Sequence, residues 1–229
     1  SLKVLEPFEA LHWFDALGDK HYPSEQEFQK MIGDLVFNNL NLTLSKRQLE
    51  RLSRLRPGHL ETDEERRQYE MENVWALLQE NEYLISILYE ERELFPRLIG
   101  TCGNFYAVEY VKPMENPTTA ISRSDSPAEW AKRLKLAVMI LDLVEELDNS
   151  TPEPFYLCDV KINHFGLAYG DTKLKFLDLD AVFPRSVVNR FIGDGRSCEI
   201  HQDCDYFDCR SVCSENKKCE SPVLNDNLQ

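Results

Sequence analysis

Apolar residues recur with a helical period over two long stretches of the chain. Between Glu70 and Glu91 they are spaced three or four positions apart, with no Gly or Pro inside, which predicts one helix. Ser126-Pro127-Ala128-Glu129 supplies an N-cap, a proline at the first helical position and an acidic first turn. It opens a second helix over Trp130–Leu147, which we expect to be buried in the core.

Three shorter amphipathic helices are predicted nearer the amino terminus, at residues 8–17, 25–37 and 45–55. The first two resemble an EF-hand pair, because Glu27 occupies the place of the last calcium ligand. Counting back, however, puts Ala16, Gly18 and Lys20 where oxygen ligands are needed. Calcium binding is therefore not expected, and we interpret the pair as degenerate helices used for packing.

Two β-hairpins are predicted from pairs of apolar runs that flank turn residues. The first has Gly103 in its turn and the second has Gly170-Asp171. A further strand precedes the second hairpin. The runs are 98–101 and 105–111 for the first hairpin, 155–158 for the further strand, and 165–169 and 174–177 for the second hairpin.

Asp159 and Asp178 each follow one of these apolar runs, and pairing of the runs would bring both carboxylates to one end of the ribbon. Such a pair can serve phosphoryl transfer, with one carboxylate orienting the attacking hydroxyl and the other holding the metal on a nucleotide. An aspartate at a strand end is more often a turn former or a cap. The functional interpretation therefore depends on the combination of the two aspartates with Lys161 and the hairpin.

This segment resembles the catalytic loop and the metal-binding loop of protein kinases. Asp159 and Lys161 match the family's base and the lysine two residues later. The slot of the metal-binding Asn holds His164, with Asn163 one position early. The resemblance implies that Asp159 orients the acceptor and that Lys161 neutralises the transferred phosphoryl group.

The metal-binding triplet departs from the kinase pattern, because Asp178-Leu179-Asp180 stands where Asp-Phe-Gly is usual. The resemblance implies metal binding by Asp178. Asp180 adds a carboxylate that could supply the oxygen ligand that His164 does not provide. An imidazole in place of an oxygen ligand suits Mg²⁺ poorly and Mn²⁺ better. Leu157 and Cys158 replace the usual His and Arg, so an activation loop bound by a phosphate-binding Arg is not expected.

Elements upstream of the two loops come in the order found in kinases. Glu80 lies on the apolar face of the helix over 70–91, where a carboxylate needs a partner; in kinases that partner is the lysine that holds the phosphates. Glu82 is the competing choice, and a solvated Glu is the alternative to either. Lys3 is the candidate lysine, but no glycine-rich loop precedes it, so the true lysine can lie upstream of Ser1.

The second strand of the first hairpin runs into the position of a kinase hinge. By this resemblance, Glu109 and Val111 would offer backbone groups to adenine. An ordinary core hairpin is the alternative that the pattern leaves open.

Five of the seven cysteines lie between residues 196 and 220, in a stretch with few aliphatic residues. Such a segment cannot build a core and needs covalent cross-links. Zinc is the alternative, but there is no Cys-x-x-Cys and only His201 is nearby, so disulfides are favoured. Because five is odd, one partner is Cys102, Cys158 or a cysteine outside the chain. The five are Cys198, Cys204, Cys209, Cys213 and Cys219.

Two sequons, at Asn41 and Asn149, predict glycosylation and a secretory route. The net charge of −14 argues against nucleic acid and anionic membranes as partners. No apolar run is long enough for a transmembrane helix. A hydrophobic content of 42% over 229 residues supports one bilobal globular unit.

Together these features resemble the divergent, cysteine-rich protein-kinase-like family of the endoplasmic reticulum, over most of residues 70–224. The resemblance implies an α+β, bilobal, protein-kinase-like fold, incomplete at both ends. We expect an N-lobe part with the helical insertion, a C-lobe part with both loops, and a disulfide-rich segment, and no further C-lobe helices after Val187. These parts span residues 1–111 with the EF-hand-like insertion at 8–55, then 112–190 and 191–229.

Members of that family are single-pass type II membrane proteins with a lumenal domain. The resemblance implies location in the lumen of the endoplasmic reticulum or secretory pathway, with any membrane anchor outside this chain. It implies ATP with Mg²⁺ or Mn²⁺ as cofactors and an unknown lumenal or secreted protein as acceptor or partner. The alternative is a catalytically silent pseudokinase whose disulfide cluster forms a partner surface.

Overall fold

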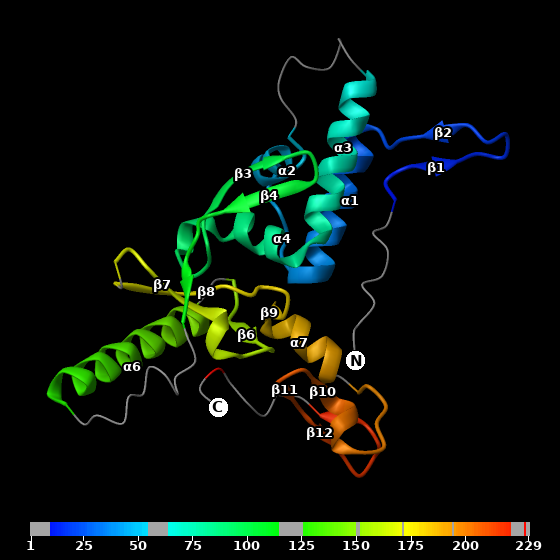
Figure 1. Cartoon of the computed structure of the whole chain (residues 1–229). Helices are drawn as coiled ribbons and strands as arrows, with labels where there is room; N and C mark the ends of the chain where they lie inside the picture. The colour runs from blue at the N-terminus through cyan, green and yellow to red at the C-terminus, as the bar shows by residue number, and fades with distance from the viewer. Residues whose placement is uncertain are drawn as a thin grey trace. The chain divides into compact units, whose positions relative to one another are not determined.

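The computed structural model describes residues 10–54, 64–114, 126–149, 152–170, 172–193, 195–220 and 227 (Figure 1). The chain divides into two compact units, which we describe separately. The first contains residues up to 84 together with 99–107, and the second contains 85–98 and the residues from 108 onward. Lys3, the candidate phosphate lysine, lies outside the described residues, and so does Asp171 of the second predicted turn.

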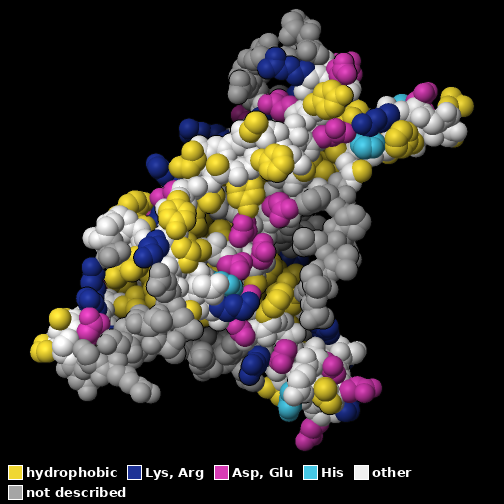
Figure 2. Space-filling model, viewed as in Figure 1, with side chains coloured by type: hydrophobic (Ala, Val, Ile, Leu, Met, Phe, Trp, Pro, Cys, Tyr) yellow, Lys and Arg dark blue, Asp and Glu magenta, His cyan; other side chains and the backbone are white. Residues whose placement is uncertain are grey.

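The first unit opens with a β-hairpin where the sequence predicted a helix. The Asp15 carboxylate accepts hydrogen bonds from the backbone amides of Leu17 and Asp19. Such local bonds compete with helix formation, and the prediction of a helix over 8–17 is therefore wrong for residues 10–17. The hairpin carries exposed hydrophobic side chains (Figure 2). Its strands are β1 (Trp13–Phe14) and β2 (Lys20–His21).

Two helices follow close to their predicted positions, and each begins with a capping box. In α1 (Glu25–Leu40), Ser24 caps the helix and its amide donates to the Glu27 carboxylate at 2.8 Å. In α2 (Lys46–Leu52), Ser45 and Gln48 form the same arrangement. Glu27 therefore completes a cap. Because no helix precedes α1 within residues 10–24, the EF-hand-like pair is not present in this part of the described chain.

The single helix predicted over 70–91 is divided into two. α3 (Glu64–Gln79) ends at a bend, and α4 (Asn81–Leu88) begins one residue later, followed by the 3-10 turn η1 (Glu90–Arg92). The bend is at Glu80, whose amide donates to the carbonyl of Leu77. The apolar spacing continues across the bend, so periodicity alone could not reveal it.

The first predicted hairpin is confirmed by β3 (Leu98–Cys102) and β4 (Phe105–Val108). In the turn between them Gly103 has φ +59°, a backbone conformation that favours glycine. Both strands belong mostly to the first unit.

Two small sheets lie in the second unit ahead of the cysteine-rich segment. The three-stranded sheet has the order β5-β7-β8, and its β7–β8 hairpin confirms the second predicted hairpin. The two-stranded sheet pairs β6 with β9. The strands are β5 (Lys112–Pro113), β6 (Phe155–Leu157), β7 (Phe165–Ala168), β8 (Lys173–Phe176) and β9 (Val182–Pro184).

Two helices accompany these sheets. α6 (Pro127–Asp148) begins as predicted, with the Ser126 side chain accepting from the amide of Glu129. Only its carboxyl-terminal part is buried, through Leu143, Val144 and Leu147, whereas Trp130 is 64% exposed. The expectation of a helix buried along its whole length is therefore wrong. After β9, α7 (Arg185–Ile192) begins just before Val187 and continues past it, into the region where no further C-lobe helix was expected.

The cysteine-rich segment has little regular structure of its own. It contains the 3-10 turn η3 (His201–Cys204) and two short hairpins. Charged side chains of both signs lie on the face of this segment that Figure 2 shows. The hairpin strands are β10 (Asp205–Tyr206), β11 (Cys209–Arg210), β12 (Val212–Cys213) and β13 (Cys219–Glu220).

We expect Gly166→Ala to lower the free energy of unfolding by about 1–3 kcal/mol. A Cβ at Gly166 would lie 2.7 Å from Val111 Cγ1 and 3.0 Å from the Lys112 carbonyl oxygen, and the carbonyl is held by pairing of β5 with β7. Denaturant unfolding of Gly100→Ala is the control, because a Cβ there meets nothing within 4 Å. Equal effects of the two substitutions would contradict this account of β5–β7 packing.

Candidate functional site

Asp159, His164 and Asp178 come together in the second unit. One ligand atom from each of the three side chains lies within 4.8 Å of the other two. His164 is buried, and its Nε2 lies 3.1 Å from Asp178 Oδ2. The structure thus brings together three of the residues that the sequence assigned to catalysis and metal binding.

Backbone hydrogen bonds explain why these residues meet. Asp159 follows β6, and the adjacent Cys158 amide donates to the carbonyl of Ala181 at 2.8 Å. The 3-10 turn η2 (Ile162–His164) then leads into β7. The amide of Leu177 donates to the carbonyl of His164 at 2.7 Å, which places Asp178 beside the imidazole.

The orientation of the imidazole decides what the cluster can bind. His164 Nδ1 lies 3.2 Å from the carbonyl oxygen of Asp159, which can only accept, so Nδ1 carries a hydrogen. In neutral His164, Nε2 then presents a lone pair to the Asp178 carboxylate. Two acceptors at this distance need a proton or a cation between them.

The spacing and chemistry of the donors fit a divalent metal. Two ligands of an octahedral ion, each at about 2.1 Å from it, lie about 3.0 Å apart. The 3.1 Å between His164 Nε2 and Asp178 Oδ2 matches such an edge. Two carboxylates and one imidazole suit Mn²⁺ better than Mg²⁺.

Lys161 lies next to this cluster. Its Nζ donates to Asp159 Oδ2 at 2.8 Å, while its side chain is 59% exposed. The hydrogen bond from Lys161 to Asp159 raises the pKa of the lysine, and the charges of Asp178 and Asp208 add to this effect. Lys161 is therefore an exposed cation beside the cluster.

The other two predicted metal residues occupy less central positions. Asn163 is exposed in η2, whereas the neighbouring His164 is buried, so the imidazole is the one that faces the carboxylates. Asp180 is exposed, and its amide lies 3.4 Å from Asp178 Oδ1. Its role in metal binding stays a prediction.

Glu80 and Glu82 lie in the first unit on either side of the bend between α3 and α4. Glu80 is half-buried. The Glu82 carboxylate accepts from the Tyr106 hydroxyl at 2.7 Å. Since Lys3 lies outside the described residues, pairing of Glu80 with a phosphate lysine stays a prediction.

Glu109 forms an ion pair that the sequence analysis missed. It binds the ammonium group of Lys175, which is 1% exposed in the middle of β8. Its Oε1 also accepts from the amide of Arg97 at 3.0 Å, and its own amide donates to the Arg97 carbonyl at 2.9 Å. A lysine within an apolar strand run was the available signal, because lysine is rarely fully buried without a partner.

This pairing bears on the expected adenine contacts. The Glu109 amide already has a backbone acceptor, and Val111 is buried. Burial raises the pKa of the Glu109 carboxyl, but the hydrogen bonds from Lys175 and the Arg97 amide outweigh it, so the pKa lies below its usual value. The contribution of Glu109 and Val111 to nucleotide binding stays a prediction.

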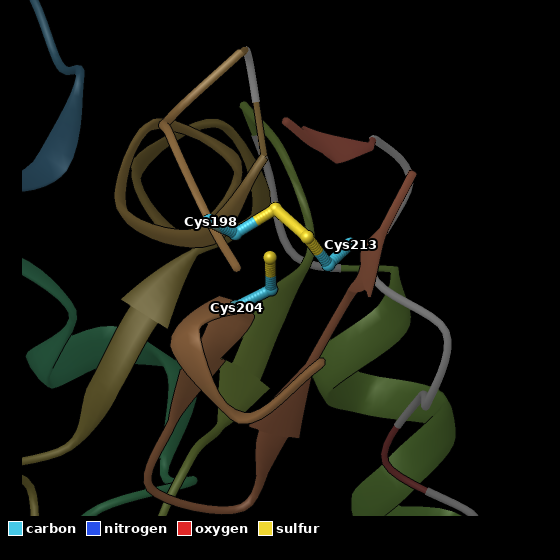
Figure 3. Close-up of side chains that lie close together, drawn as sticks. All are labelled: Cys198, Cys204 and Cys213. Atoms are coloured by element: carbon cyan, nitrogen blue, oxygen red, sulfur yellow. A yellow bond between two sulfur atoms is a disulfide. The ribbon is translucent and has the colours of Figure 1, made fainter. Parts of the chain in front are cut away.

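Disulfides account for the cysteine cluster. The bonds are Cys158–Cys209, Cys198–Cys213 and Cys204–Cys219, and exposed Cys102 stays free. Figure 3 shows Cys204 pointing toward the Cys198–Cys213 bond. The prediction of disulfides rather than a zinc site is confirmed. Cys158 is the partner that the odd number of clustered cysteines required. Such bonds are typical of proteins that fold in an oxidising compartment.

Both predicted glycosylation sites have exposed asparagines. Asn41 lies at the carboxyl end of α1 and Asn149 at that of α6. Ser150 and Thr151 of the second sequon lie outside the described residues. Glycosylation at both positions stays a prediction.

Comparison with known proteins places this site in a family. The model of the protein-kinase domain of FAM69 matches residues 74–229, which contain the cluster, Lys161 and all three disulfides. The chain belongs to this family. The kinase-like resemblance and the α+β class are thereby confirmed. FAM69 membership also explains why the loops keep kinase order although their residues diverge.

A mouse relative supports the same assignment. An 89-residue segment is 32% identical to "Divergent protein kinase domain 2A" of Mus musculus, covering 38% of this chain and 19% of the mouse protein. No solved structure matches the chain. In the part of the chain that the structure describes, no helix is long and apolar enough to cross a bilayer.

We expect Lys175→Met to lower the free energy of unfolding by about 3 kcal/mol, because it leaves the Glu109 carboxylate without its buried cation. Adding Glu109→Gln should restore most of the loss, and a double-mutant cycle by denaturant unfolding measures the coupling. Additive effects would contradict the pairing.

The same pair predicts a pH dependence. Because the folded-state pKa of Glu109 is lowered, its contribution to stability is present above its unfolded pKa of about 4.3 and is lost as pH falls through the lowered value. The double variant should lack this part of the acid destabilisation.

Proposed function

We propose that this FAM69-family domain binds ATP with a divalent metal and transfers its terminal phosphoryl group to a lumenal or secreted acceptor. The observation that carries this proposal is the buried imidazole of His164, which presents Nε2 to the Asp178 carboxylate at 3.1 Å. With His164 neutral, Nε2 and the carboxylate are two acceptors that need a cation between them. A metal ion would satisfy both groups.

The proposed roles follow from the position of each side chain. Asp178 and His164 would hold the metal, with Asp159 at its edge. One oxygen of Asp159 is bound by Lys161, so the other is available to orient an acceptor hydroxyl and receive its proton. Lys161 would neutralise charge on the phosphoryl oxygens. The metal, when bound, supplies charge neutralisation between the terminal phosphates.

Location in the endoplasmic reticulum or a later secretory compartment is part of the proposal. Its support is the three disulfides, which persist in oxidising environments. The acceptor is proposed to be a protein of the same compartment.

Asp178→Asn should reduce the affinity for ATP in the presence of Mn²⁺ by tenfold or more, on the order expected for a lost charged metal ligand. The fold should be retained, since Asp178 is half-buried at a strand end and the amide keeps its shape. Isothermal titration with and without Mn²⁺ measures the change, and Asp142→Asn on exposed α6 is the charge-matched control. Unchanged metal dependence would falsify the metal role.

His164→Asn should move metal preference toward Mg²⁺. An asparagine oxygen replaces the imidazole nitrogen, and hard oxygen ligands suit Mg²⁺. The ratio of ATP affinities in Mn²⁺ and Mg²⁺ is the readout, and it should fall relative to the unsubstituted chain. If neither protein binds nucleotide with either metal, the pseudokinase alternative is favoured.

A further inference from the structure

The turn between β10 and β11 lies against the catalytic loop, although the two are distant in sequence. The carboxylate of Asp208 accepts from the amide of Val160 at 2.8 Å. The amide of Asp208 donates to the carbonyl of Cys158 at 2.7 Å. These two bonds lie on either side of Asp159, so Asp208 bridges the backbone that carries the candidate base.

The backbone of this turn is held in an unfavourable conformation. Phe207 has φ +53°, which is costly for a bulky residue and persists only where the surroundings determine it. Such conformations are concentrated at functional sites. Here the strained residue immediately precedes the one that contacts the catalytic loop.

Packing on one side of the hairpin fixes its position. The Tyr206 ring stacks on Phe191 at a centroid distance of 5.1 Å and meets Phe183 edge-on. Phe191 belongs to α7, and Phe183 belongs to β9, which pairs with β6 just before the catalytic loop. The hairpin is therefore anchored to the same elements that carry the loop.

A covalent bond completes the connection. Cys158, immediately before Asp159, is joined to Cys209, immediately after Asp208, and both are buried. The catalytic loop and the turn are thus joined by two hydrogen bonds and one disulfide within residues 158–160 and 208–209. We call these contacts the loop clamp.

We propose that Asp208 is a positioning residue of this domain, acting through the loop clamp to hold Asp159 and Lys161 in place. The functional part of this inference depends on the proposed function, whereas the clamp itself does not. The cysteine-rich segment thereby serves the catalytic loop directly.

Hydrogen–deuterium exchange of the full chain tests the clamp independently of nucleotide binding. Asp208→Ala removes the acceptor for Val160 but keeps the backbone bond to Cys158. Exchange in residues 158–161 should rise about tenfold, the scale of one lost charge-assisted hydrogen bond. Asp208→Asn keeps an acceptor oxygen and should restore most of the protection. Asp205→Ala, in the strand before the turn, is the matched control and should leave exchange at 158–161 unchanged.

ATP affinity in Mn²⁺ gives the functional readout. Asp208→Ala should weaken binding severalfold while its thermal midpoint stays near that of the unsubstituted chain, with partial recovery in Asp208→Asn. Unchanged exchange at 158–161 would overturn the clamp. Increased exchange with unchanged ATP affinity would overturn the positioning role. If exchange increases but even the unsubstituted chain binds no nucleotide, the clamp is supported and the proposed function is overturned.

Paired cysteine substitutions test the covalent part. Replacing both Cys158 and Cys209 by alanine should raise exchange at 158–161 and weaken nucleotide binding. Replacing both Cys198 and Cys213 is the control, because that bond lies within the cysteine-rich segment alone. This control should raise exchange within the cysteine-rich segment and leave exchange at residues 158–161 unchanged. Equal effects of the two pairs on 158–161 would show that general destabilisation, rather than the clamp, is responsible.

Discussion

The buried imidazole of His164 is the group on which the candidate site depends. One ring nitrogen meets the carbonyl of Asp159 and the other meets the carboxylate of Asp178, so a single side chain spans both loops. The Leu177 amide bonds the His164 carbonyl and adds a backbone connection between the same loops. Asparagine, the usual kinase residue at this position, is shorter. The larger histidine ring fills the core position against Phe176 while still presenting a nitrogen to the site.

Disulfides stabilise the cysteine-rich segment, which is too poor in apolar side chains to be stabilised by a hydrophobic core. The cysteine-rich segment has hardly any aliphatic side chains, and its own buried cluster consists of Cys198, Cys204 and Cys219 with Cys213 packed against it. Two disulfides therefore hold this segment together. The third, Cys158–Cys209, has a different consequence, because both of its cysteines belong to the buried cluster of Tyr156, Phe183 and Val188, next to the candidate site residue Asp159. The cysteine-rich segment is thereby joined covalently to the residue that precedes Asp159.

The sequence could predict features that depend on local order. Pairing of β7 with β8 places His164 beside Leu177, so Asp178 and the residues just before β7 were expected to lie close together. Features that depend on distant partners were not predictable: Lys175 and Glu109 are 66 residues apart, and Asp208 is 48 residues from Val160. The helix expected at 8–17 failed for a local reason, since the Asp15 side chain competes for backbone amides. The bend at Glu80 was hidden because the apolar spacing continues through it.

The ion pair of Lys175 and Glu109 shows how Asp178 is held from a second direction. A buried lysine loses its hydration, and here the Glu109 carboxylate, with the Tyr169 hydroxyl 3.3 Å from the ammonium nitrogen, compensates for that loss. An apolar residue in place of Lys175 would avoid the cost of burying a charge, but its packing would not select one alignment of β8. The charged pair fixes β8 to Glu109, and the bond from the Phe176 amide to the Leu94 carbonyl fixes the same strand to Leu94, so β8 is held in one register. Asp178 lies two residues beyond Phe176, so a shift of this register would move its carboxylate away from His164. The pair therefore contributes to the geometry of the site as well as to stability, although neither residue belongs to the Asp159, His164 and Asp178 cluster.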